Sequence, residues 1–230
     1  MNTAQPSVNR DGIRQAVEQA GLALRGALRL EPEEQTGLLA GMHQIVLVGL
    51  IGRTGWDSFA RSPEAGDGRP DPLDRWSERC LGELARHLGA QALYPFGGPP
   101  YWPFQRWAQR AEPLAPSPLG LLIHPDYGLW HSYRGALAFA EPIDWPPAAQ
   151  APSPCASCAD QPCLTACPVS AFGQAGYDVA ACAGWLRSPA GQTCMDQGCQ
   201  ARLACPVGRP FAHRPDQARF GMRAFLAARD

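Results

Sequence analysis

The chain has 230 residues, of which 45% are hydrophobic, 20 are basic and 21 are acidic, so its formal net charge is -1. This length suffices for one good-sized core or two modest domains, and the balanced charge excludes the broad positive field of a non-specific nucleic-acid binder, so we expect no nucleic-acid partner. No stretch approaches 18 consecutive apolar residues, and the N-terminus has neither an apolar run nor a twin-arginine pair, which predicts a cytoplasmic protein that does not bind a membrane.

The first predicted element is a helix over residues 8–30. Its apolar residues recur at spacings of three or four, and they are Ile13, Val17, Ala20, Leu24 and Leu28. Such spacing places side chains along one buried stripe of a helix. The run HQIVLVGLIG at 43–52 is continuously apolar and ends in glycine, which predicts a buried strand.

A longer helix is predicted over 71–90, after a polar loop rich in glycine and proline. Asp71 is the expected N-cap, Pro72 occupies the first helical position, and Gly89 ends the helix. Cys80 falls in the middle of this helix. We expect it to be a small buried hydrophobic residue rather than a ligand.

Four shorter elements follow. They are a strand at QALYPF (91–96), a helix at PFQRWAQRA (103–111), and strands at LGLLIHP (119–125) and YRGALAFA (133–140). Mixed helix and strand signals of this kind favour an α+β or α/β architecture over a helical bundle or an all-β fold. We therefore assign the chain to the α+β class.

A proline-rich segment separates this half from a cysteine-rich half. We interpret 146–154 as a linker that follows an N-terminal domain at 1–145. The cysteine-rich domain is predicted at 155–212, and 213–230 is predicted to be a C-terminal helix or tail.

Eight of the nine cysteines lie after residue 154, and they are Cys155, Cys158, Cys163, Cys167, Cys182, Cys194, Cys199 and Cys205. Eight thiolates are two sets of four, the number that two [4Fe-4S] clusters require. In two-cluster ferredoxins the cysteine before proline ligates the other cluster, and both Cys167 and Cys205 precede proline. We therefore assign Cys155, Cys158, Cys163 and Cys205 to one cluster (the first set). The second set is Cys167, Cys182, Cys194 and Cys199.

Zinc binding and disulfide formation are two other possible uses of the cysteines. Structural zinc usually takes two C-x2-C pairs, whereas this chain has one, at Cys155 and Cys158. Disulfides require an oxidising compartment that the N-terminus does not indicate. Zinc remains the main alternative to iron-sulfur clusters.

The cysteine half resembles that of the epoxyqueuosine reductase family. The shared order is a first cysteine run, an isolated cysteine in a short helix and a second run, here CASCADQPCLTACP, ACAGWLRSP and CMDQGCQARLACPVG. Upstream, residues 117–146 are similar both to these reductases and to CblC-type cobalamin-processing proteins, most specifically at HPDYGLWHSYRGALAF.

The resemblance implies a nitroreductase-like α/β domain that holds cobalamin, followed by a ferredoxin-like domain with two clusters that deliver electrons to the corrinoid. The implied corrinoid contacts in the HPDYGLWH segment are His124, Tyr127, Gly128, Trp130 and His131. The alternative is that this segment forms a polar turn between two strands and that its tryptophan packs in the core.

Two departures argue against the reduction of a modified tRNA base. The family has an acidic proton donor shortly before the segment that SPLGLLIHP matches, whereas residues 94–111 contain no carboxylate. We also expect the tRNA-binding C-terminal repeats of the family to be missing. The first hypothesis is therefore an iron-sulfur redox protein that passes electrons to a corrinoid or a small substrate and receives them from a donor protein. The alternatives are a simple ferredoxin-like carrier and a zinc-stabilised interaction module, so whether the chain is an oxidoreductase enzyme stays open.

Overall fold

The computed structural model describes residues 8–173 and 175–229, and the chain divides into two compact units. The first unit contains the chain up to residue 50 together with 54–112 and 132–150, and the second contains 51–53, 113–131 and 151–230. Residues 113–131 therefore belong with the cysteines, whereas the sequence prediction placed them in a 1–145 domain. The N-terminal stretch 1–7, on which part of the localisation argument depends, lies outside the described residues.

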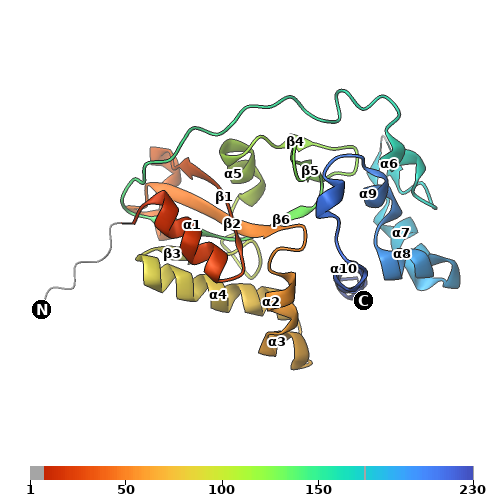
Figure 1. Ribbon diagram of the computed structural model, residues 1–230, viewed down its shortest axis with the longest axis horizontal. Helices are drawn as coiled ribbons and strands as arrows, with labels where there is room; N and C mark the ends of the chain where they lie inside the picture. Colours follow the sequence, from red (N-terminus) through yellow and green to blue (C-terminus); the bar gives the residue numbers. More distant parts are fainter. Residues whose placement is uncertain (1–7, 174, 230) are drawn as a thin grey trace, which may run out of the picture. The chain divides into compact units, whose positions relative to one another are not determined.

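The first unit combines a sheet with helices (Figure 1). In the described residues its strands lie in the order β1 (Ala23–Arg29), β2 (Gln44–Ile51), β6 (His131–Phe139) and β3 (Gln91–Leu93). Its helices are α1 (Arg10–Gln19), α2 (Trp56–Ala60), α3 (Pro63–Gly66), α4 (Pro72–Leu88) and α5 (Phe104–Ala111), with 3-10 turns at Pro32–Glu34 and Gly37–Leu39. The pairings of β1 with β2 and of β3 with β6 are antiparallel, which confirms the mixed α+β class.

Strand β2 forms the centre of this sheet. Residues 45–48 are completely buried, as expected for a strand covered on both faces. Its register places Ile45 opposite Leu28 and Gly49 opposite Ala23, with an irregularity in β1 between Leu24 and Ala27. The strand predicted at 43–52 is confirmed.

The single helix predicted over 8–30 is wrong in its second half. Helix α1 ends at Gln19, Gly21 turns the chain with a φ of 74°, and β1 begins at Ala23. Gly26 allows β1 to pack closely against α5, because a Cβ at this position would lie 2.2 Å from the backbone carbonyl oxygen of Ala111. This close packing against α5 is a tertiary contact that helical periodicity does not reveal.

The helix predicted over 71–90 is confirmed as α4, and Gly89 ends it with a φ of 65°. Asp71 does not cap it as expected, because its backbone is left-handed and its side chain forms no capping hydrogen bond. Cys80 is 8% exposed on this helix, in agreement with a packing role. The elements predicted around β3, α5 and β6 are present, but the strand at 119–125 is reduced to β5 (Leu122–Ile123).

The second unit consists of short elements. Residues 140–161 contain no helix or strand and lead into it. Its strands form two small antiparallel ribbons, β4 (Ala115–Pro116) with β5 and β7 (Phe172–Gly173) with β8 (Gly176–Tyr177). Its helices are α6 (Pro162–Thr165), α7 (Val179–Arg187), α8 (Gln192–Gln197), α9 (Gln200–Ala204) and α10 (Pro215–Ala227), with 3-10 turns at Pro189–Gly191 and Arg209–Phe211. The C-terminal segment predicted at 213–230 thus contains a helix over 215–227, and Asp230 lies outside the described residues.

The contact between β2 and β6 requires a glycine at position 49. A Cβ there would lie 1.9 Å from the backbone carbonyl oxygen of Ser132. We expect Gly49→Ala to lower the free energy of unfolding by about 3 kcal/mol, because overpacking forces the strands apart. Gly66→Ala is the control, since no heavy atom lies within 4 Å of its Cβ position, and it should change stability by less than about 0.5 kcal/mol. Urea denaturation measures the free energy of unfolding of both variants. An equal loss of stability in Gly49→Ala and Gly66→Ala would contradict this explanation.

Candidate metal centre

The first set of cysteines surrounds one small cavity in the second unit. The lining residues are Cys155, Cys158, Cys163 and Cys205 with Pro118, Ile123, Pro154, Gln161, Pro162, Pro206 and Val207. Apart from the sulfur atoms the wall is almost entirely apolar. The structure therefore brings together the four thiols that the sequence assigned to one site.

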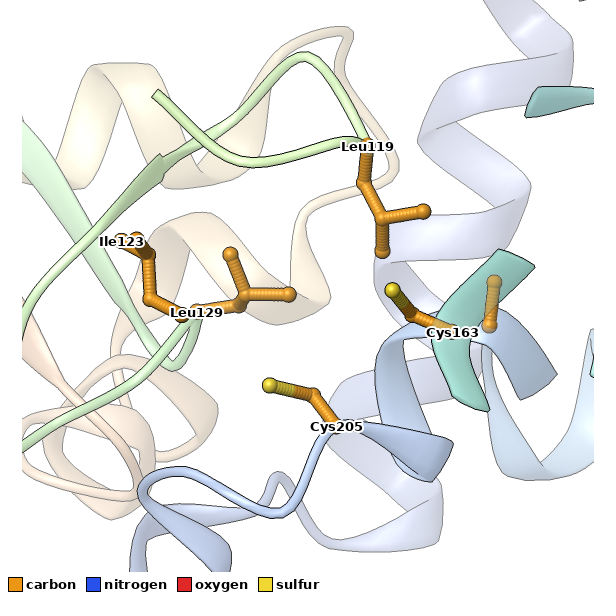
Figure 2. Close-up of a cluster of buried hydrophobic side chains, with 6 residues drawn as sticks. Leu119, Ile123, Leu129, Cys163 and Cys205 are labelled. Carbon is orange, nitrogen blue, oxygen red and sulfur yellow. The ribbon is translucent and has the colours of Figure 1, made fainter. Parts of the chain in front are cut away.

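Helices α6 and α9 place two of these thiols. Cys163 lies in α6 and Cys205 directly follows α9, and the two helices pack against each other. Both cysteines are buried in a cluster with Leu119, Ile123 and Leu129. Figure 2 shows the sulfur atoms of both cysteines directed toward the side of the cluster formed by Leu119, Ile123 and Leu129. The 119–129 segment thus forms an apolar wall for the first set.

Two glycines allow the 119–129 segment to pack closely against the loop that follows Cys205. A Cβ at Gly128 would lie 2.1 Å from the carbonyl oxygen of Val207, and a Cβ at Gly208 would lie 2.3 Å from the backbone of Tyr127. Both glycines have positive φ, at 57° and 72°. This close backbone approach explains why residues 113–131 belong to the cysteine unit.

Electrostatic interactions within the first set indicate how close its members lie. Burial raises the pKa of Cys155, and the neighbouring Cys205, Cys163 and Cys158 raise it further. Burial also raises the pKa of Cys163, with contributions from Cys205 and Cys158. Four such thiols ionise together only when a cation compensates their charge, as metal binding does.

The second set shows the same kind of interaction. Burial raises the pKa values of Cys194 and Cys199, and in both cases Cys182 and Cys167 raise them further. Hence the four members of the second set are electrostatic neighbours, although they come from α7, α8 and the segments that flank α6 and α9. Cys167 and Cys199 of the second set also pack against the apolar cluster that contains Cys163 and Cys205.

Backbone N–H groups point at several of these sulfur atoms. The N–H of Ala171 donates to Cys167 Sγ at 3.3 Å. A hydrogen bond from the backbone N–H of Gln200 partly offsets the raised pKa of Cys194. Hydrogen bonds from the backbone N–H groups of Ala201 and Arg202 do the same for Cys199. Hydrogen bonds to sulfur are among the factors that set the potentials of iron-sulfur clusters.

In the described part of the chain, no group of three or more His, Cys, Asp or Glu side chains converges closely enough to hold a single metal ion. The requirement of a [4Fe-4S] cube is different. Its four thiolates bind four separate iron atoms at the corners of the cube, so they surround a volume rather than a point. The cavity of the first set and the apolar wall around it suit such a group.

The five residues implied as corrinoid contacts are engaged in other ways. All of them lie in the second unit and not in the first. His124 is 5% exposed, and its Nδ1 accepts hydrogen bonds from the backbone N–H groups of Asp126 at 3.0 Å and Tyr127 at 3.4 Å. Nε2 of His131 lies 3.1 Å from the carbonyl oxygen of Leu122.

Trp130, the larger of the tyrosine and tryptophan in this group, is also enclosed. Trp130 is 4% exposed, with Arg202 over its ring at 4.4 Å and His213 edge-on at 5.2 Å. The backbone of Gly128 packs closely against the carbonyl oxygen of Val207. His124 and Trp130 are thus packed inside the second unit, and the assignment of the five residues as corrinoid contacts stays a prediction.

No protein-family model and no curated protein sequence matches this chain. Solved structures of epoxyqueuosine reductases do match it. One that contains an epoxyqueuosine-modified tRNA-Tyr stem loop gives a TM-score of 0.53 at 13% identity and covers 91% of this chain and 68% of its own. The enzyme from Streptococcus thermophilus gives 0.52 at 14% identity, with coverages of 91% and 69%. A selenomethionine-labelled epoxyqueuosine reductase gives 0.50 at 14% identity, with coverages of 91% and 68%.

This chain has a fold like that of epoxyqueuosine reductase. The likeness extends over both compact units, since it covers 91% of the chain. At 13–14% identity it establishes the fold and not the reaction. None of the helices in the described residues is long and apolar enough to cross a membrane.

The sequence analysis missed one residue of this site. Arg202 lies between Cys199 and Cys205 and contacts the buried Trp130. Its position between cysteines of the two sets was a visible signal. Its contact with Trp130 was not visible, because the aromatic partner is supplied by a segment about 70 positions earlier in the chain.

Proposed function

We propose that this protein is an iron-sulfur electron carrier, with one [4Fe-4S] cluster held by Cys155, Cys158, Cys163 and Cys205. Cys167, Cys182, Cys194 and Cys199 would hold a second cluster. The observation that carries the proposal is that Cys155, Cys158, Cys163 and Cys205 line one small cavity in the compact unit that contains all eight thiols. The fold likeness to epoxyqueuosine reductase supports it.

The chain's own residues would supply three functions. The thiolates anchor iron, the backbone N–H groups of residues such as Ala171 stabilise negative charge on sulfur, and the apolar wall around Ile123 and Leu129 keeps water away from the first set. Each cluster, when bound, provides a one-electron redox centre. Reducing equivalents would come from a donor protein.

We extend the proposal to the electron acceptor. The family resemblance and the fold likeness favour a corrinoid in a nitroreductase-like first domain, served by a ferredoxin-like cysteine domain. The residues named for that role, His124 and Trp130 among them, are buried within the second unit and do not support it. The corrinoid part of the proposal therefore depends on the likeness alone, and no step is assigned to it.

An anaerobic reductive titration tests electron transfer. We expect protein reconstituted with iron and sulfide to take up about two electrons per chain, one for each cluster, with bleaching of its visible absorbance. The reduced protein is then mixed with hydroxocobalamin or with a simple one-electron dye. Reduction of both would fit a general carrier, and a tight complex with hydroxocobalamin alone would fit a corrinoid protein. Uptake of no electrons by iron-loaded protein would refute the proposal.

A further inference from the structure

The second unit exposes an aromatic side chain where β8 and α10 meet. Tyr177 is 38% exposed, and the centre of its ring lies 4.7 Å from that of Phe172 and 6.2 Å from that of Phe225. Tyr177 and Phe172 are register partners in β8 and β7. Phe172 packs against the buried apolar cluster on which Cys167 and Cys199 also pack. The three rings therefore extend from the neighbourhood of the second set to the surface.

Helix α10 lies next to the segment that holds two thiols of the second set. It packs against α8, in which Cys194 is buried. It also packs closely against the turn before Cys199, because a Cβ at Gly198 would lie 3.1 Å from the Cβ of Ala218. The outer side of α10 is thus close to the second set.

The α10 segment is strongly basic. Residues 214–229 contain four arginines and one carboxylate, which are Arg214, Arg219, Arg223, Arg229 and Asp216. Arg219 and Arg223 are exposed on consecutive turns, and Arg219 pairs with Asp196 of α8 at 3.0 Å. The guanidinium carbon of Arg229 lies 3.7 Å from the centre of the Phe225 ring, so charge and aromatic surface are in contact. We define the α10 surface as Tyr177, Arg219, Arg223, Phe225 and Arg229.

This composition is typical of a docking surface. Aromatic residues and arginine are enriched in protein–protein interfaces relative to the rest of the surface. An excess of arginine attracts a partner of negative potential and raises its association rate. The helix rises only about 15 Å from Arg219 to Arg229, so an interface of the usual size covers the whole α10 surface.

We propose that the α10 surface is the docking site of the electron donor and that the donor is a small redox protein with an acidic contact surface. This inference rests on the proposed iron-sulfur function and adds the point at which electrons enter. A donor docked there brings its own redox centre close to the second set. In each encounter the donor loses one electron and one cluster gains it, so no atom or proton moves between the two proteins.

Stopped-flow reduction of the fully loaded protein tests this site. The probe is reduced flavodoxin, a small acidic flavin protein, and the measured quantity is the second-order rate constant for bleaching of the clusters without oxygen. We expect Arg219→Gln combined with Arg223→Gln to lower this constant about tenfold at low ionic strength, because two steering charges are lost. At a salt concentration of about 0.5 M the difference should nearly disappear, because salt screens the attraction.

Arg61→Gln combined with Arg86→Gln is the matched control. Both arginines are exposed in the first unit, so the same charge is lost away from the α10 surface. The control should react with flavodoxin within about twofold of the wild-type rate, because steering depends on charges near the contact. Tyr177→Ala should lower the rate constant at low and at high salt, since the contact it removes is apolar. Equal decreases in the two double variants, or wild-type rates in all three variants, would overturn the proposal.

Two other occupants of the α10 surface would give different results. A short RNA hairpin that binds the wild type but not the Arg219→Gln, Arg223→Gln variant, while the flavodoxin reaction is unaffected, would identify a nucleic acid. A wild-type dimer in light scattering that Tyr177→Ala converts to a monomer would identify a second copy of this chain. Either result would overturn the proposal.

Reduced methyl viologen, a small cation that needs no docking surface, separates this proposal from the iron-sulfur function. If neither methyl viologen nor flavodoxin reduces loaded wild-type protein, the iron-sulfur function fails. If methyl viologen reduces it and flavodoxin does not, only the docking proposal fails. Should the double variant lose iron, Arg223→Gln alone replaces it, because Arg223 is exposed, and we expect a decrease of about threefold at low ionic strength. An unchanged rate in that variant would contradict the proposal.

Discussion

Replacing Cys205 by alanine should halve the iron content of the anaerobically loaded protein, from about eight to about four atoms per chain. Cys205 lines the cavity of the first set with Cys155, Cys158 and Cys163, so its loss should remove one cluster and leave the other. Cys182→Ala should have the same effect through the second set. Iron and acid-labile sulfide are measured on each variant.

Double variants test how the thiols are divided. Cys163→Ala combined with Cys205→Ala removes two ligands of one set, so about four iron atoms should remain. Cys182→Ala combined with Cys205→Ala affects both sets, and almost no iron should remain. Cys80→Ala is the control, because Cys80 is buried on α4 in the first unit and should not affect iron content. Equal iron content in the two double variants would contradict the assignment.

The second large effect is expected in the first unit, at a buried ion pair. The Arg25 side chain is completely buried, and its Nε and Nη2 donate to the two carboxylate oxygens of Glu112 at 2.9 and 2.8 Å. The hydroxyl of Tyr133 donates to the same carboxylate. Burial raises the pKa of Tyr133 well above its usual range, so this hydroxyl keeps its proton.

We expect Glu112→Ala to lower the free energy of unfolding by about 3–5 kcal/mol, because it leaves the buried Arg25 without its counter-ion. Tyr133→Phe removes one hydrogen bond to a charged group and should cost about 2 kcal/mol. The control is Glu83→Ala, since Glu83 is 57% exposed and lies 4.0 Å from Arg79, and it should cost less than about 1 kcal/mol. Denaturant unfolding monitored by tryptophan fluorescence measures all three. If Glu112→Ala lowers the free energy of unfolding no more than Glu83→Ala does, the Arg25–Glu112 ion pair contributes little to stability.

Features encoded locally could be predicted from the sequence. Helix α4 has its proline at the first position and Gly89 at its end, and β2 is a continuous apolar run. The approach of Cys155, Cys158 and Cys163 to one cavity also follows from their close spacing in the chain. In each case the chemistry that selects the structure lies within a few residues.

Features that depend on distant contacts could not be predicted. The break between α1 and β1 reflects the approach of Gly26 to Ala111 in α5. The transfer of 113–131 to the cysteine unit depends on the contact of Gly128 with Val207, some 80 positions later. The burial of His124 could not be predicted either, because a histidine that accepts two backbone hydrogen bonds inside a unit looks the same in sequence as an exposed one.

The measurement that tests the central claim most directly is the metal and sulfide content of wild-type protein purified without exposure to oxygen. Two four-cysteine sites predict about eight iron atoms and about eight acid-labile sulfides per chain, with a broad visible absorbance that bleaches on reduction. A colourless protein with about two zinc ions and no labile sulfide would contradict the account, because zinc needs the thiolates but neither accepts electrons nor contains sulfide.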